Sequence, residues 1–190
     1  AIVSLDTTGN RSFGFYRNGM ADVQLEFSEI DKTLLKTCRI FHFGSVSMTS
    51  EPARSATLKA ALMAKQAGAL ISYDPNLRAP LWEYLAQAKK MILEGMHLAD
   101  VVKLSGEELE FLSSADLKTG TELLYQKYKM KLLAITLGPD GCVCRMKQGF
   151  FTSATFDVSC VDTTGAGDAF WGAVLASILK EPIPLENYSP

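Results

Sequence analysis

The chain has 190 residues, of which 47% are hydrophobic and 21% are charged, and its formal net charge at pH 7 is −2. A chain of this length buries roughly 70% of the surface that it exposes when unfolded, so a sizeable core forms without disulfides or metal. Lys and Arg are dispersed along the sequence, which argues against a protein that binds nucleic acid or an anionic membrane surface. The apolar runs are shorter than the ~20 residues of a membrane-spanning helix.

The first 27 residues predict a small β structure. The expected strands are residues 1–5, 12–17 and 22–27. Asn18-Gly19 is a turn signal between the second and third of these strands. Because the three strands carry few core-type residues, we expect residues 1–27 to form part of a lid and residues 28–190 to form an α/β core.

From residue 28 onward, expected helices alternate with expected strands. The helices are expected at 31–37, 52–67, 81–96, 106–112 and 119–127, and the strands at 39–44, 69–74, 100–104 and 132–137. A hairpin is expected at 141–146 and 149–154, before a last helix that begins at Ala166. Short apolar strands separated by helices indicate βαβ units. We therefore predict a doubly wound α/β fold, with a mostly parallel sheet and helices on both of its faces.

The four cysteines and two histidines lack the spacing of a zinc site, because no two cysteines form a CxxC pair. Cys142 and Cys144 fall on one face of an expected strand, where unpaired thiols serve as small packing residues. Such usage is typical of a reducing compartment, so we expect a cytoplasmic protein. The sequence begins inside an expected strand and ends soon after an expected helix, which suggests a piece of a longer protein.

Polar residues follow three of the expected strands, at the sheet edge where open α/β proteins bind their ligands. The three runs are 74–78 (Asp-Pro-Asn-Leu-Arg), 105–108 (Ser-Gly-Glu-Glu) and 136–141 (Thr-Leu-Gly-Pro-Asp-Gly). Each run also has a purely structural interpretation. Pro75 can end a strand before a turn, Ser105 and Glu108 can form a capping box, and Pro139-Asp140-Gly141 is a turn sequence. His42, inside an apolar strand, is interpreted as a core histidine.

A glycine-rich run, 162–168 (Asp-Thr-Thr-Gly-Ala-Gly-Asp), leads into the last helix. Gly165 and Gly167 allow close approach to the main chain, and the first-turn N–H groups of a helix attract an anion, most often phosphate. Asp168 would repel a phosphate there unless it served another purpose, such as accepting a proton from an attacking hydroxyl group. The structural alternative is an ordinary helix start with Asp162 or Thr163 as the N-cap.

Residues 162–173, which continue this run with Ala-Phe-Trp-Gly-Ala, resemble the C-terminal signature of the ribokinase-like (PfkB) carbohydrate kinases. The resemblance extends from residue 1 to about residue 180. It is strongest to the fructokinases, through Phe15-Tyr16-Arg17 and the run 74–78. The resemblance implies that Gly165, Ala166 and Gly167 form an anion hole and that Asp168 is the catalytic base. The GxxxxGK[ST] motif is absent from the sequence, which argues against a P-loop enzyme.

The resemblance also implies roles for the polar runs and the lid. Arg78 would meet the transferring phosphoryl group, and Tyr16 and Arg17 would reach the sugar. The residues implied at the nucleotide are Asn76, Ser105, Glu108, Thr136, Gly138, Gly141, Gly165 and Gly167. Glu108 would hold Mg²⁺ through water, and Ser105 replaces the usual Asn of that motif. Relatives often bind a monovalent cation such as K⁺ near Asp162 and often pair through their lids, so a homodimer is expected.

We therefore expect an ATP-dependent sugar kinase that converts fructose to fructose 6-phosphate. The alternative within the family is 2-keto-3-deoxygluconate kinase, which shares the pattern of Arg17 and Arg78. The alternative from another class is a non-catalytic sugar- or nucleotide-binding protein on the same fold, although such a protein has no need of Asp168 beside a phosphate. The family's N-terminal sugar-binding segment and its late adenine-contacting helix are missing here, so the 190-residue piece itself is expected to be inactive.

Overall fold

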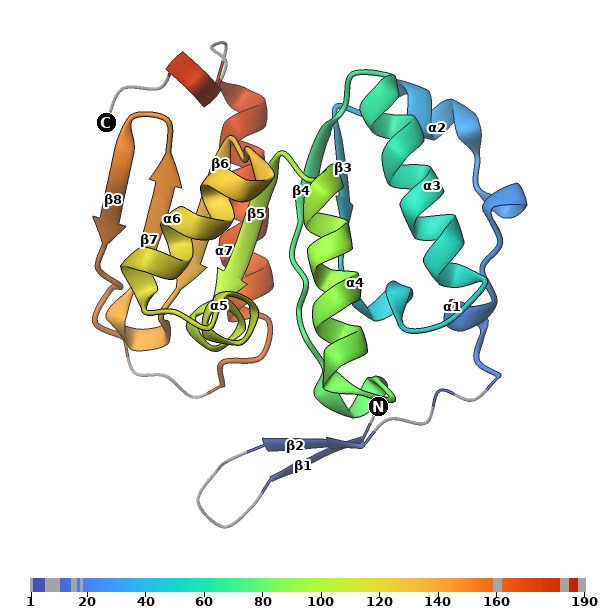
Figure 1. Ribbon diagram of the computed structural model, residues 1–190, viewed down its shortest axis with the longest axis horizontal. Helices are drawn as coiled ribbons and strands as arrows, with labels where there is room; N and C mark the ends of the chain where they lie inside the picture. Colours follow the sequence, from blue (N-terminus) through green and yellow to red (C-terminus); the bar gives the residue numbers. More distant parts are fainter. Residues whose placement is uncertain are drawn as a thin grey trace.

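The computed structural model describes residues 2–5, 11–14, 17, 19–158, 162–181 and 185–187. Its centre is a six-stranded sheet with the order β3-β4-β5-β6-β7-β8 (Figure 1). The strands are β3 (Ile40–Phe43), β4 (Leu70–Tyr73), β5 (Val101–Ser105), β6 (Leu132–Thr136), β7 (Cys142–Met146) and β8 (Gly149–Ser153). Strands β3 to β6 are parallel, whereas β7 and β8 are antiparallel to their neighbours, which confirms the mostly parallel sheet.

Helices cover both faces of the sheet, as the sequence predicted (Figure 1). One face carries α3 (Ala53–Gln66), α4 (Leu85–Leu98), α5 (Gly106–Ser113) and α6 (Leu117–Tyr128), and the other carries α7 (Ala166–Lys180). The parallel strands follow one another in chain order, and crossovers between parallel strands are right-handed. The helices α3 to α6 that connect them therefore share one face, and α7 arrives from the hairpin to cover the opposite face.

Alternation of side chains along the strands divides the core into two layers. Ile71 and Val102 point toward α3 to α6 and are fully buried there. Val101 and Ala134 point the other way, where Trp171 of α7 packs against them. The larger layer is the one under four helices. The α7 layer therefore holds both an apolar contact and, at one end, the polar groups described below.

The N-terminal region differs in part from the expectation. Strands β1 (Ile2–Leu5) and β2 (Arg11–Gly14) form a separate two-stranded sheet, but the third predicted strand, 22–27, is wrong. That stretch contains α1 (Ala21–Gln24) and the start of the 3₁₀ helix η1 (Phe27–Glu29). The side chains of Glu26 and Glu29 cap η1 reciprocally, and this local capping outweighs a short alternating pattern.

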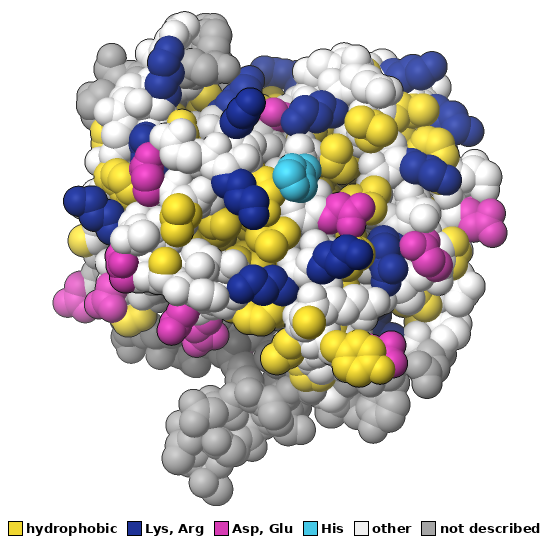
Figure 2. Space-filling view, viewed as in Figure 1, with side chains coloured by type: hydrophobic (Ala, Val, Ile, Leu, Met, Phe, Trp, Pro, Cys, Tyr) yellow, Lys and Arg dark blue, Asp and Glu magenta, His cyan; other side chains and the backbone are white. Residues whose placement is uncertain are grey.

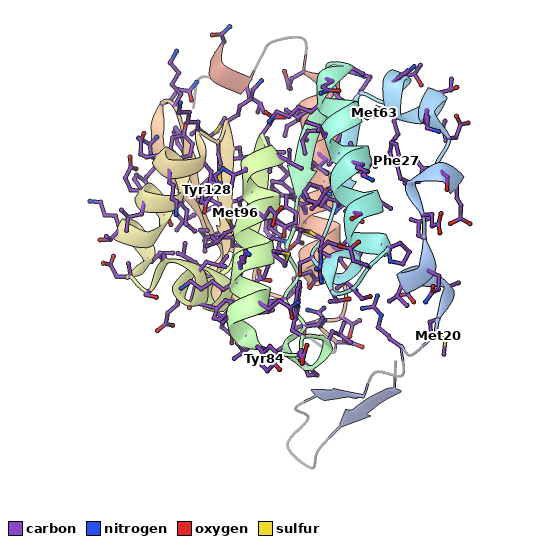
Figure 3. The ribbon with its side chains drawn as sticks, turned by 45° about the vertical axis from the view of Figure 1, so that its right-hand side comes forward. Met20, Phe27, Met63, Tyr84, Met96 and Tyr128 are labelled. Carbon is purple, nitrogen blue, oxygen red and sulfur yellow. The ribbon has the colours of Figure 1, made fainter. Side chains whose placement is uncertain are left out.

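Helix α2 (Lys32–Thr37) follows η1 within the predicted range 31–37, and the side chain of Asp31 caps it. The 3₁₀ helix η1 packs on α3, and Figure 3 places Phe27 beside Met63. Another boundary also differs, because α4 begins at Leu85 and not at Leu81. The residues before it form the 3₁₀ helix η3 (Ala79–Leu81), with Pro80 in its first turn.

Lys and Arg side chains alternate with Asp and Glu side chains on the face shown in Figure 2, without a large patch of one sign. In the part of the chain that the structure describes, no helix combines the length and apolar character that a membrane span requires.

Candidate active site

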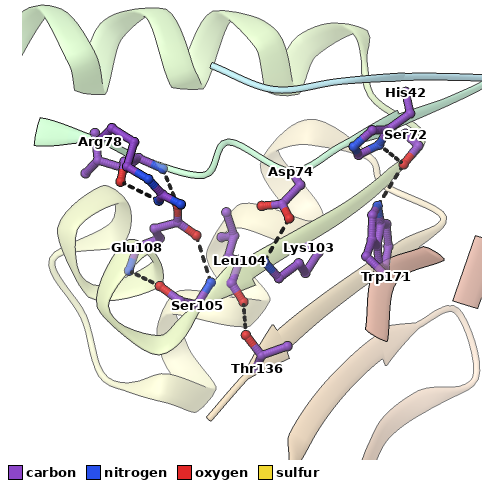
Figure 4. A network of polar contacts seen from close by, with 11 residues as sticks. His42, Ser72, Asp74, Arg78, Lys103, Leu104, Ser105, Glu108, Thr136 and Trp171 are labelled. Atoms are coloured by element: carbon purple, nitrogen blue, oxygen red, sulfur yellow. Dashed lines mark hydrogen bonds and ion pairs between the residues drawn. The ribbon is translucent and has the colours of Figure 1, made fainter. Parts of the chain in front are cut away.

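The carboxyl ends of β3, β4 and β5 and the N-terminal end of α7 meet at one edge of the sheet (Figure 4). Two contacts fix this arrangement. A β-carbon built on Gly167 of α7 would stand 3.0 Å from Nζ of Lys103 on β5. One turn later, Nε1 of Trp171 donates a 2.8 Å hydrogen bond to Oγ of Ser72 on β4. Helix α7 therefore points its N-terminal end at the edge where parallel sheets bind ligands.

The start of α7 lacks a side-chain cap. Gly165 is the N-cap residue, with φ 77°, so the sequence-based alternative of Asp162 or Thr163 as the N-cap is wrong. The Asp162 carboxylate instead accepts the N–H of Thr164 at 2.7 Å, within the turn that precedes the helix. The N–H of Ala166 donates to the carbonyl oxygen of Thr163 at 3.1 Å. Because no side chain caps the helix, the next N–H groups of its first turn stay available to an anion. Asp168 is exposed in the same turn, as a base that meets a substrate must be.

A cavity of about 380 Å³ joins this helix start to the residues expected at the nucleotide. Its lining includes Thr136, Gly138 and Gly141 from the β6–β7 turn together with Ala166 and Gly167 from α7. Gly141 cannot be replaced without movement, because its φ is 89° and a β-carbon there would stand 2.0 Å from the carbonyl oxygen of Ser153. The turn thus closes on the hairpin by a contact that only glycine permits, and that contact shapes one wall of the cavity.

Glu108 ties two of the predicted runs together. Its Oε1 accepts the N–H of Leu77 at 2.6 Å, and its Oε2 accepts the N–H of Ser105 at 2.8 Å. The hydroxyl of Ser105 accepts the N–H of Glu108 in return, which confirms the capping box. Burial raises the pKa of the Glu108 carboxyl, and the two main-chain hydrogen bonds offset part of that shift. Asn76, inside the first of these runs, adopts the left-handed conformation with φ 51°.

The contacts of Glu108 also bear on the expectation that this residue holds Mg²⁺ through water. Among the described residues, no group of three or more His, Cys, Asp and Glu side chains could ligate a metal ion directly. Each Glu108 oxygen already accepts one hydrogen bond and keeps a second lone pair for a water molecule. These residues fit a carboxylate that acts on Mg²⁺ through water, and they do not fit a direct ligand.

Arg17 and Arg78 lie away from the cavity at the start of α7. Arg17 donates to the carbonyl oxygen of Val46 at 3.3 Å and to Oγ1 of Thr49 at 3.2 Å, and it pairs with Asp22. These contacts attach Arg17 to the segment after β3, at the same edge of the sheet. Nη1 of Arg78 donates to the carbonyl oxygen of Leu77. Tyr16, the other residue expected at the sugar, lies outside the described residues.

Asp74 and Lys103 form a buried ion pair that was not identified from the sequence. Nζ of Lys103 lies 2.8 Å from Oδ2 of Asp74, and both residues are buried, with 7% and 5% of their surface exposed. Oδ1 of Asp74 is buried without a hydrogen-bond partner. The signal that could have drawn attention to Lys103 is its position inside the apolar run Val101-Val102-Lys103-Leu104, where a lone cation requires a partner.

His42 is not the core histidine that the sequence suggested, because its side chain keeps exposed surface on β3. Its Nδ1 lies 2.8 Å from Oγ of Ser72, the atom that also accepts the Trp171 hydrogen bond. Partial burial lowers the pKa of the His42 imidazole. Asp74 and Asp168 raise that pKa by a smaller amount, and Lys103 lowers it further. The pKa of His42 therefore depends on the charges of Asp74, Lys103 and Asp168.

The chain matches a family of known proteins over most of its length. The family described as "pfkB family carbohydrate kinase" matches residues 1–187. "Probable fructokinase-2" of Arabidopsis thaliana is 45% identical over 190 residues, a match that covers 98% of this chain and 57% of that protein. The chain therefore spans little more than half the length of that relative.

Two solved structures are similar over nearly the whole chain. The fructokinase of Xylella fastidiosa with bound ATP has a TM-score of 0.85 and 34% identity, and the match covers 94% of this chain and 56% of that one. A double mutant of fructokinase from Vibrio cholerae O395, bound to fructose, ADP and a potassium ion, has a TM-score of 0.84 and 28% identity. That match covers 97% of this chain and 59% of the Vibrio chain.

Proposed function

Because the chain belongs to the pfkB family of carbohydrate kinases, we propose that the full-length protein transfers the γ-phosphoryl group of ATP to a hydroxyl group of fructose. The product is fructose 6-phosphate. The observation that carries the proposal is the cavity of about 380 Å³ that the β6–β7 turn shares with the uncapped first turn of α7. The names of the relatives, which are fructokinases, support the choice of sugar.

The proposed chemistry depends on positioning and on charge, because phosphoryl transfer passes through a loose transition state. Thr136, Gly138 and Gly141 line the nucleotide side of the cavity. The main-chain N–H groups of residues 165–168 hold the charge that develops on the transferring group. Asp168 accepts the proton of the attacking hydroxyl late in the transfer. Its exposed position at the helix start supports this role over a core position.

Charge neutralisation involves the remaining polar runs. Magnesium, when bound with ATP, would neutralise phosphate charge, and Glu108 would orient its waters. Arg78 contributes positive charge at the end of β4, and Asn76 and Ser105 border the nucleotide. A potassium ion near Asp162 is also proposed, because the similar Vibrio fructokinase holds potassium. Arg17 and Tyr16 are proposed to approach the sugar from the lid.

Three finer expectations belong to the same proposal. The division into a lid at residues 1–27 and a core at 28–190 is supported by the separate β1–β2 sheet. Pairing of two copies through this lid is a prediction. A cytoplasmic location is also a prediction, and one relative, "Probable fructokinase-6, chloroplastic" of Arabidopsis thaliana, carries another compartment in its name.

The experiment is a panel of sugars with ATP and Mg²⁺ on the full-length protein, with ADP release as the readout. The proposal predicts that fructose gives the highest kcat/KM. A higher value for 2-keto-3-deoxygluconate would favour the alternative kinase. Absence of turnover with every sugar, together with retained ATP binding, would favour a non-catalytic binding protein.

A further inference from the structure

The buried ion pair of Asp74 and Lys103 has no role in the chemistry proposed above. The two residues come from neighbouring parallel strands, and both side chains project toward the α7 face (Figure 4). Removing two charges from water carries a large desolvation cost, and an apolar pair of the same shape often stabilises a protein as well or better. Packing alone therefore does not explain why a cation and an anion occupy this place.

The position of Lys103 relative to α7 suggests an explanation. Its Nζ would lie 3.0 Å from a β-carbon on Gly167, so the ammonium group lies against the first turn of the helix. The partial charge at a helix N-terminus is positive and disfavours a cation there. The unfavourable contact is tolerable when anions lie nearby. Asp74 is one such anion, and a phosphoryl group at the uncapped helix start would be another.

Gly167 allows this approach through the space that it leaves. Gly165 needs glycine because its φ is 77°, whereas Gly167 does not have a positive φ. A side chain at position 167 would instead place its β-carbon 3.0 Å from the Lys103 ammonium nitrogen, closer than most such contacts. The second glycine of the run therefore gives a buried full charge access to the helix turn, in a region of low dielectric where charges act strongly.

We infer that Asp74 is a positioning residue for phosphoryl transfer, which holds the Lys103 ammonium group beneath the first turn of α7 so that its charge attracts the transferring phosphoryl group. The inference rests on the proposed function, because it assigns the anion at this helix start as a phosphate. Asp74 acts through Lys103 and does not itself touch the phosphate. Its unpartnered Oδ1 fits this role, since the carboxylate is placed for one partner and not for a full set of hydrogen bonds.

The test replaces the pair by uncharged side chains of similar shape, Asp74→Leu together with Lys103→Met, in the full-length protein. We expect the double variant to unfold at a temperature close to that of the parent, since shape is kept and two buried charges are removed. We also expect kcat with fructose and ATP to fall about 10- to 100-fold, below the loss for a direct oxyanion donor. Unchanged stability with kcat within threefold of the parent would overturn the inference.

A second measurement separates the inference from the proposed function. Binding of ADP and of inorganic phosphate is followed by calorimetry, and we expect the double variant to bind each at least tenfold more weakly. If the parent does not phosphorylate fructose, the proposed function is wrong, and this binding still tests the ion pair. Equal anion binding by parent and variant overturns the inference whatever the activity.

Two single variants keep the inference testable if the double variant fails to fold. Lys103→Met removes the ammonium charge and leaves the Asp74 carboxylate in place, so it should lose anion affinity in the same direction as the double variant. The matched control is Lys65→Met, which removes the half-buried pair of Lys65 and Asp100 at the opposite end of β5. The control should bind anions as the parent does. A loss of affinity in the control equal to that in Lys103→Met would contradict a role specific to the pair of Asp74 and Lys103.

Discussion

Gly167 leaves room for the ammonium group of Lys103, because a β-carbon at this position would stand 3.0 Å from the lysine Nζ. The contact joins the first turn of α7 to the middle strands of the sheet. It places a buried positive charge at the one helix start in this chain whose sequence carries the kinase signature. A substitution at Gly167 is therefore expected to change both the stability of the protein and the position of this charge at the site.

We predict that Gly167→Ala lowers the free energy of unfolding, mainly because the added methyl meets Lys103. The added methyl would stand 3.0 Å from the ammonium nitrogen, so Lys103 must shift by a few tenths of an ångström against Asp74. Overpacking of this kind costs about 1–3 kcal/mol. In a Lys103→Ala background the same methyl meets open space, so its cost should fall by more than half. Urea unfolding of the four proteins of this double-mutant cycle measures the coupling. Equal costs in both backgrounds would show that the two residues do not interact.

The β6–β7 turn predicts a contrast between two glycines. A methyl at Gly141 would stand 2.0 Å from the Ser153 carbonyl oxygen, so Gly141→Ala must move the hairpin and should cost about 3 kcal/mol or more. Gly138 also has a positive φ, but a methyl there meets no atom within 4 Å. Gly138→Ala should therefore cost only the backbone strain of about 1–2 kcal/mol.

Thermal unfolding and ADP binding of the two variants check this contrast. Gly141→Ala should lose ADP affinity with its stability, because the turn forms a wall of the cavity, whereas Gly138→Ala should keep most of both. A Gly138→Ala variant that is as damaged as Gly141→Ala would contradict the steric explanation.

Much of this architecture could be predicted from the sequence, because each parallel strand is a short apolar run bounded by polar residues. The carboxyl ends of such strands meet at one edge, so the runs that begin at Asp74, Ser105 and Thr136 could be assigned to one site. The Asp74–Lys103 pair could not, since its partners are 29 residues apart and neither has a local signal for the other. The third lid strand, predicted at 22–27, was wrong for a local reason. The capping of Glu26 and Glu29 competes with an alternating pattern of only six residues.

The buried carboxyl of Glu108 predicts a pH dependence of stability. Burial raises its pKa above the ordinary value of 4.5, so the folded protein binds the proton more tightly than the unfolded chain does. The stability of the parent should therefore fall, relative to Glu108→Gln, as the pH rises from 4.5 through the raised pKa. Urea unfolding of both proteins across this range measures the difference. A difference that stays constant with pH would contradict the raised pKa.

His42 predicts a dependence of the opposite sign. Its pKa is lowered below 6.5, so the unfolded chain binds the proton more tightly, and stability should be lost as the pH falls below 6.5. His42→Gln should remove this loss while keeping a hydrogen-bonding group for Ser72. The chain has only two histidines, so an NMR titration assigns the imidazole signals with one variant. A His42 pKa at or above 6.5 would contradict the effect of burial.

Asp168 is the residue on which the proposed kinase chemistry depends most directly. The decisive measurement is kcat for fructose phosphorylation by the full-length protein and by Asp168→Asn, with ADP affinity measured on both. We predict a loss of several orders of magnitude in kcat with nearly unchanged ADP affinity, because the carboxylate accepts a proton and does not hold the nucleotide. A kcat within tenfold of the parent would contradict the assignment of Asp168 as the base.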